Sequence, residues 1–175
     1  SEASAATLRR AHKVHPITAL QSEYSLWTRD PEDGVLAACR ELGVGFVAFS
    51  PLGRGIFGGK LKADTRLESS DFRNQIPRFS QENLARNLQM VERFTAVAQA
   101  KGCTPAQLAL AWVLAQDPAI VAIPGTKRQK YVEENAAAGA ITLTAADLEA
   151  IAAAVPASAI SGARYTPAGM AQVNR

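Results

Sequence analysis

The sequence predicts an α/β protein in which helices alternate with parallel strands. Apolar residues at helical spacing over about 5–13 and 32–42 alternate with short apolar runs at 17–23 and 44–50. The connections between these runs fit only the crossovers that join parallel strands. A third apolar run at 120–124 is typical of a strand that is covered on both faces.

The ends of the first two helices carry recognisable signals. Ser4 is a favoured residue for capping the first helix, and Pro16 ends it. Asp30 and Pro31 open the second helix, and Gly43 stands at the usual glycine position after a helix end.

Residues 51–81 interrupt the alternation with a long loop. Its first part is rich in glycine, and glycine permits a close approach of the backbone to a ligand. A loop of this length inside a compact domain is usually functional. A mobile surface insertion would have the same composition.

Two long helices follow the loop and a shorter one lies near the end of the chain. The first covers 83–100, and the second is capped by Thr104. The second is apolar nearly all round, so Trp112 is expected in the core. Thr144 is the expected cap of a last helix over 145–154.

Residues 120–135, IVAIPGTKRQKYVEEN, run from a strand through a Pro-Gly turn into a basic helix start. Thr126 is the predicted cap, and the helix is expected to begin near Lys127 or Arg128. The positive end of the helix dipole, together with Lys127, Arg128 and Lys130, would favour an anion such as phosphate. Many helix starts of this composition bind nothing.

Composition excludes several classes of protein. The chain is 47% hydrophobic, and its 19 basic and 16 acidic residues are interspersed, so nucleic-acid binding is not indicated. Cys39 and Cys103 fit neither a disulfide framework nor a metal spacing, and His12 and His15 are expected at the surface. No apolar run spans a bilayer and no signal peptide is visible, so we expect a cytoplasmic protein.

The segments QSEYSLW, AFSPLGRG, TPAQLALAWVLAQ and IPGTKRQKYVEEN together resemble the aldo/keto reductase superfamily. The resemblance implies a (β/α)8 TIM barrel, of which residues 1–175 would be the carboxyl-terminal half, with a long loop at 51–81. The chain would begin at the end of barrel strand 5 and contain strands 6, 7 and 8. This explains why only three strands are visible and why Ser1 is not Met. The composition of residues 155–175 predicts an irregular tail.

The resemblance also implies roles for residues around the nicotinamide of a bound cofactor. Ser1 and Gln21 would hold its carboxamide, although Glu2 replaces the more common Asn of the family. Phe49 would stack on the nicotinamide ring. Trp27 would border the substrate pocket together with the 51–81 loop.

The rest of the cofactor would be bound by two further segments. The loop crossing the pyrophosphate would consist of Ser50, Pro51, Leu52, Gly53 and Arg54. The 2′-phosphate site would consist of Gly125, Thr126 and Lys127, and the adenine would face Tyr131, Glu134 and Asn135. Lys127 favours NADP(H) over NAD(H), because a fixed cation at a helix start gains from an additional phosphate.

The implied activity is the NADP(H)-dependent reduction of a small aldehyde or ketone by hydride transfer. The catalytic Tyr, Lys, Asp and His of the family belong to the amino-terminal half, and none of them matches a residue here. The chain alone is therefore expected to be inactive and to need that half as a partner. Two alternatives remain: a non-catalytic nucleotide-binding or regulatory subunit of the same fold, and an isolated half-barrel without activity.

Overall fold

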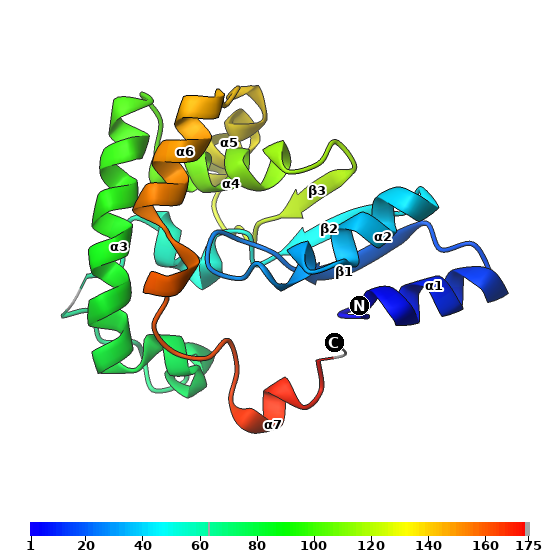
Figure 1. The fold of residues 1–175 in the computed structure, drawn as a ribbon. Helices are drawn as coiled ribbons and strands as arrows, with labels where there is room; N and C mark the ends of the chain where they lie inside the picture. Colours follow the sequence, from blue (N-terminus) through cyan, green and yellow to red (C-terminus); the bar gives the residue numbers. More distant parts are fainter. Residues whose placement is uncertain (63, 174–175) are drawn as a thin grey trace.

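Three parallel strands form the centre of the protein (Figure 1). The computed structural model describes residues 1–62 and 64–173. Strands β1 (Ala19–Glu23), β2 (Gly45–Phe49) and β3 (Ile120–Ile123) lie in the order β1-β2-β3. Their parallel pairing confirms the predicted topology, and it brings the loops that follow all three strands to one edge of the sheet.

Helices supply the connections between the strands. Helix α1 (Ala5–Val14) precedes β1, and α2 (Val35–Leu42) joins β1 to β2. The second helix begins later than predicted, because a 3₁₀ turn over Asp30–Glu32 and a left-handed Gly34 (φ 85°) come first. Helix α1 packs against α2, and α2 packs against β2, so these two helices lie on one side of the sheet.

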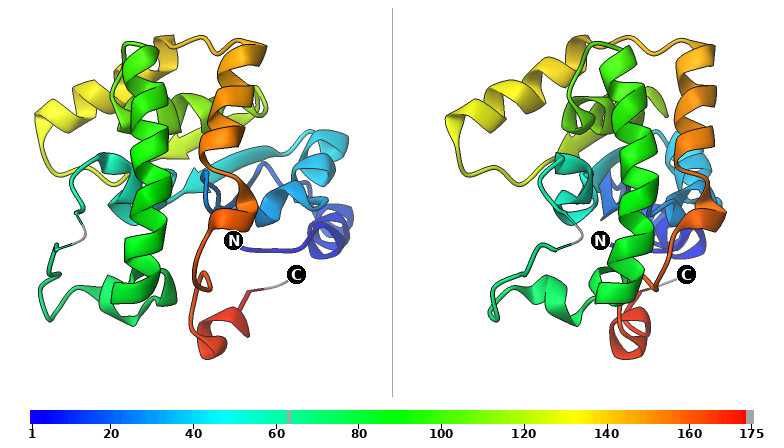
Figure 2. Two further views of the ribbon diagram at one scale, coloured as in Figure 1. Left: turned by 60° about the vertical axis from the view of Figure 1, so that its left-hand side comes forward. Right: turned by 90° about the vertical axis from the view of Figure 1, so that its left-hand side faces the viewer.

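The remaining helices build the other end of the molecule. Helices α3 (Gln81–Ala100) and α4 (Pro105–Ala115) precede β3, and α4 packs against that strand. Helices α5 (Gln129–Ala137), α6 (Ala145–Ala154) and α7 (Pro167–Met170) follow it. Helix α6 lies along α3 in both views of Figure 2.

The predicted helix caps Ser4, Thr104 and Thr144 and the glycine after α2 are confirmed. The hydroxyl oxygen of Ser4 accepts a bond from the Thr7 N–H, and Gly43 adopts the left-handed conformation after α2 (φ 66°). Thr104 and Thr144 each form a complete capping box, with Gln107 and Asp147 respectively.

One face of the sheet carries the core. Leu20, Phe46 and Ile120 are buried on this face. Trp112 of α4 is also buried, and its ring lies 5.5 Å from that of Tyr24, which confirms its predicted place in the core.

The opposite face of the sheet is open at Gln21 and along β3 among the described residues. Gln21, Val47 and Val121 are in register across it, and Phe49 is in register with Ile123. Val121 and Ile123 are 55% and 46% exposed. The prediction that the third strand is covered on both faces is therefore wrong, because α4 covers only one of them and no described segment covers the other.

The first residues of the chain lie against the free edge of β1. The Glu2 N–H donates to the Gln21 carbonyl at 2.8 Å, and the Ser1 hydroxyl donates to the same carbonyl at 3.1 Å. Residues 1–2 thus occupy the position that a neighbouring strand would take beside β1.

The long loop and the chain after α6 are more ordered than predicted. The loop contains 3₁₀ turns at Gly53–Gly58, Phe72–Gln75 and Pro77–Phe79. The chain after Ala154, predicted to be irregular, includes α7 and reaches back toward the end of β1 (Figure 1). No helix among the described residues has the length and apolar character needed to cross a membrane.

Candidate functional site

A groove of about 1250 Å³ opens at the edge where the strands end. One wall is the loop after β2, and the other is the β3–α5 connection with the first turns of α5. Ligand sites of proteins typically occupy about 300–1,000 Å³, so this space is large enough for a dinucleotide. Of the predicted cofactor residues, it is lined by Leu52, Gly125, Thr126, Lys127, Tyr131, Glu134 and Asn135.

The start of α5 differs from the prediction. The helix begins at Gln129 with Arg128 in the N-cap position, so Thr126 is not the cap. The Thr126 hydroxyl donates instead to the Pro124 carbonyl at 2.9 Å and accepts from the Asn135 amide at 3.0 Å. These two bonds fix the turn against the helix. They occupy the Thr126 hydroxyl, which therefore does not cap the start of α5.

The groove is basic around this helix start. No side chain caps α5, so N–H groups of its first turn are left for an anion. Lys127 and Lys130 are exposed, and both line the groove. Charge and geometry at this point suit a phosphate group.

Tyr131, Glu134 and Asn135 share one face of α5, as their spacing of three and four residues requires. Lys60 of the opposite wall contacts the Tyr131 hydroxyl, and its Nζ lies 3.8 Å from the centroid of the ring. This hydrogen bond lowers the pKa of Tyr131. The two walls of the groove therefore touch across its opening.

A second group of predicted residues lies on the open face of the sheet. Gln21 and Phe49 are two residues apart in register on adjacent strands, and Phe49 is half-buried. Ser1 reaches the same place through its bond to the Gln21 carbonyl. None of these three lines the groove.

The segment Ser50–Arg54 connects the two groups. Leu52 lines the groove, whereas Ser50, Pro51, Gly53 and Arg54 do not. Ser50 (φ 49°) and Arg54 (φ 57°) have the left-handed backbone conformation, which costs about 1–2 kcal/mol for a residue with a side chain. Strain of this kind is typical of segments that are shaped for a ligand.

The packing of Trp27 explains one glycine of this segment. A Cβ atom on Gly53 would lie 2.7 Å from Trp27 Nε1. The indole is 1% exposed, and its ring meets those of Phe57 and Phe79 edge to face. Trp27 thus packs closely against Gly53 of the loop. Its role at a substrate pocket stays a prediction.

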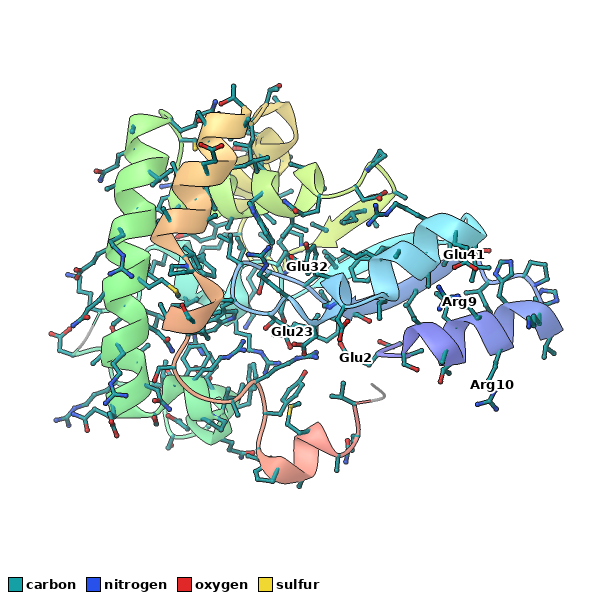
Figure 3. The ribbon with its side chains drawn as sticks, viewed as in Figure 1. Glu2, Arg9, Arg10, Glu23, Glu32 and Glu41 are labelled. Atoms are coloured by element: carbon teal, nitrogen blue, oxygen red, sulfur yellow. The ribbon has the colours of Figure 1, made fainter. Side chains whose placement is uncertain are left out.

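Sequence reasoning missed a cluster of charges at the end of β1 (Figure 3). The Glu23 side chain is 1% exposed, and its Oε2 accepts bonds from Arg54 Nη2 at 2.7 Å and from Arg164 Nε at 2.9 Å. The Tyr165 hydroxyl lies 3.3 Å from the same oxygen. The Thr28 hydroxyl donates to Oε1 at 3.1 Å.

Arg164 also joins this cluster to the start of the chain. Its two terminal nitrogens donate to the two carboxylate oxygens of Glu2 at 2.9 and 2.7 Å. Burial alone would raise the pKa of Glu23, but Arg54 and Arg164 outweigh it and hold that pKa below its ordinary value. Burial opposes the charge of Arg164 as well, and the carboxylates of Glu2 and Glu23 raise its pKa despite it.

Only part of this cluster could have been found in the sequence. A glutamate at a buried strand end requires cationic partners, so Glu23 indicates that such partners lie near the end of this strand. Arg164 lies 141 positions further along the chain, and no periodic pattern links the two residues.

Parallel strands, helical crossovers and a basic groove beyond the strand ends define an α/β protein with a groove whose size and charge suit an anionic ligand. Residues 1–156 match the model of the aldo/keto reductase family. A probable aldo-keto reductase 1 of Glycine max is 50% identical over 165 residues, which are 94% of this chain and 47% of that protein.

Two solved structures have a similar fold. A glycerol dehydrogenase from Gluconobacter oxydans aligns with a TM-score of 0.80 at 24% identity, over 87% of this chain and 47% of that one. A thermostable aldo-keto reductase, solved with the inhibitor epalrestat, aligns with a TM-score of 0.61 at 29% identity, over 85% of this chain and 44% of that one. Both imply an α/β fold of the TIM-barrel type.

The chain belongs to the aldo/keto reductase family. It spans about half the length of the curated relative that it matches.

Proposed function

We propose that residues 1–175 are the carboxyl-terminal half of an NADP(H)-dependent aldo/keto reductase. The observation that carries this proposal is the groove, in which the loop after β2 faces the start of α5. A bound nicotinamide cofactor would supply hydride from its C4 atom to the carbonyl carbon of an aldehyde or ketone.

The groove fits the adenosine end of such a cofactor. Lys127, Lys130 and the uncapped start of α5 suit a phosphate dianion, and NADP(H) differs from NAD(H) by one phosphate. Tyr131 offers an aromatic ring beside it, and Asn135 and Glu134 offer polar groups for an adenine.

The open face of the sheet fits the nicotinamide end. Phe49 presents a half-buried ring on this face, two residues along in register from Gln21 on the adjacent strand. Ser50–Arg54 would span the pyrophosphate between the two ends, with Ser1 near the carboxamide.

The chemistry that protonates the substrate is assigned to an amino-terminal half. Tyr24 is fully buried with its hydroxyl bonded to Glu32, and burial with that contact strongly raises its pKa, so it is unsuited to donate a proton. Tyr131 is engaged by Lys60, and Tyr165 belongs to the Glu23 cluster. Strands of the missing half would cover the open face formed by Val47, Val121 and their neighbours.

A non-catalytic nucleotide-binding subunit is the second candidate. It is favoured by the fact that the groove can be assembled from this chain without a matched catalytic tyrosine and lysine. The same groove would then serve binding or regulation.

Consumption of NADPH with a panel of aldehydes and ketones tests the proposal. The full-length protein should turn over, and the purified 175-residue chain should be slower by at least about 10²-fold, because proton donation contributes about 10²–10⁴ in rate. Cofactor binding by the full-length protein without turnover would favour the regulatory subunit. Equal turnover by the 175-residue chain would contradict the assignment of substrate protonation to an amino-terminal half.

A further inference from the structure

Three segments that are far apart in the sequence meet at the Glu23 carboxylate. They are the end of β1, the loop after β2 through Arg54, and the chain after α6 through Arg164 and Tyr165. Figure 3 shows Glu23 at the end of its strand, with Glu2 beside it. The Glu23 N–H donates to Glu2 Oε1 at 2.7 Å, so the first residues of the chain are held there too.

Arg54 connects this cluster to the turn that leads into the groove. Its backbone is left-handed (φ 57°), a conformation that L-residues rarely adopt unless their surroundings hold them in it. Its side chain is 9% exposed and ends in the 2.7 Å ion pair with Glu23. Its carbonyl accepts a bond from Arg73 Nη1 at 3.2 Å, so the residue is fixed from both sides.

The chain after α6 holds the other side of the carboxylate. Asn87 of α3 is fully buried, and its amide bonds both the N–H and the carbonyl of Ser161. Arg164 follows and is 4% exposed, with its side chain on Glu2 and Glu23. The ring of Tyr165 lies 4.7 Å from the Arg54 guanidinium and 4.8 Å from that of Arg164, in contact range of both cations.

We propose that Glu23 is a positioning residue for the cofactor. Through Arg54 it holds the turn Ser50–Arg54 in the strained shape that spans the pyrophosphate, and through Arg164 it makes this shape depend on the chain after α6. The inference rests on the proposed function. Glu23 itself touches no part of the cofactor in this arrangement, because its oxygens are taken by protein donors.

The pyrophosphate is common to NADPH and NADH, and this gives the proposal a distinctive signature. Loss of the Glu23 charge should weaken both cofactors by the same factor, on the order of tenfold, since one charge-assisted contact is removed from the turn. Loss of a residue at the 2′-phosphate should weaken NADPH alone. A merely structural role of Glu23 would lower stability without moving either dissociation constant of the folded protein.

The experiment compares Glu23→Gln with the wild type in the full-length protein. Amide hydrogen exchange of residues 50–58 is measured without cofactor, and both cofactors are titrated by fluorescence. We expect faster exchange at 50–58 and an equal rise in both dissociation constants. Glu41→Gln is the matched control, because Glu41 also accepts two bonds from arginine nitrogens, in this case both from Arg9, but at the exposed surface (Figure 3).

Arg164→Lys covers the case in which Glu23→Gln does not fold. Arg164 makes its ion pairs with Glu2, Glu23 and Asp30, none of which lies in the turn, so faster exchange at 50–58 in this variant would still support the coupling. Unchanged exchange at 50–58, or weakening of NADPH alone, would overturn it. If the wild type binds neither cofactor, the proposed function fails, while the exchange arm still decides whether Glu23 holds the turn.

Discussion

At the scale of single residues, the proposed function assigns to Lys127 the discrimination between the two nicotinamide cofactors. This lysine is exposed and lines the groove next to a helix start with no side-chain cap. The 2′-phosphate that is proposed to bind there is the only group that distinguishes NADPH from NADH. A charge-assisted contact contributes about 1.5–3 kcal/mol. Lys127→Ala in the full-length protein should therefore weaken NADPH about tenfold to a hundredfold and leave NADH nearly unchanged.

Fluorescence titration of both cofactors measures this difference. Lys13→Ala is the matched control, because Lys13 is an exposed lysine of α1 outside the groove. A loss of less than about threefold would assign the phosphate mainly to Arg128 or Lys130. Equal weakening of both cofactors would contradict the assignment of this segment to the 2′-phosphate.

At the scale of elements, Asp147 joins the end of α3 to the start of α6. Its carboxylate accepts bonds from Lys101 Nζ at 2.6 Å and from the N–H and hydroxyl of Thr144 at 2.7 and 2.8 Å. These bonds, with that from Lys101 the largest cause, lower the pKa of Asp147 from 3.8 to about 2. The stability that it contributes is therefore present above pH 3.8 and lost as the pH falls toward 2.

Chemical denaturation at several pH values measures this contribution. Asp147→Asn should be less stable than the wild type near neutral pH, and the two should converge as the pH falls through that window. A constant difference at all pH values would show that the titration of Asp147 is not involved.

Elements were the part of the structure that the sequence predicted best. Helix caps such as Ser4, Thr104 and Thr144 depend on residues within one turn, so local patterns suffice to find them. The displaced start of α5 shows where this fails. Threonine is a residue type that often caps helices, but the Thr126 hydroxyl accepts a hydrogen bond from the amide of Asn135, nine positions away.

At the scale of the whole molecule, features that depend on distant segments escaped sequence reasoning. The open face at Val121 and Ile123 could not be told from a doubly covered strand, because both give a continuous apolar run. The Glu23–Arg164 pair joins residues that no local pattern relates. Family resemblance predicted a cofactor-binding loop at 50–54 and further cofactor residues at 125–135. Of the loop, only Leu52 lines the groove that residues 125–135 also line, and the cofactor roles stay predictions.

The measurement that tests the central claim most directly is amide hydrogen exchange of the full-length protein with and without NADPH. If this chain supplies the cofactor site, NADPH should slow exchange in residues 50–61 and 125–135 together, since these segments form the two walls of one groove. Unchanged exchange in both segments at saturating NADPH, or slowing confined to other parts of the protein, would contradict it.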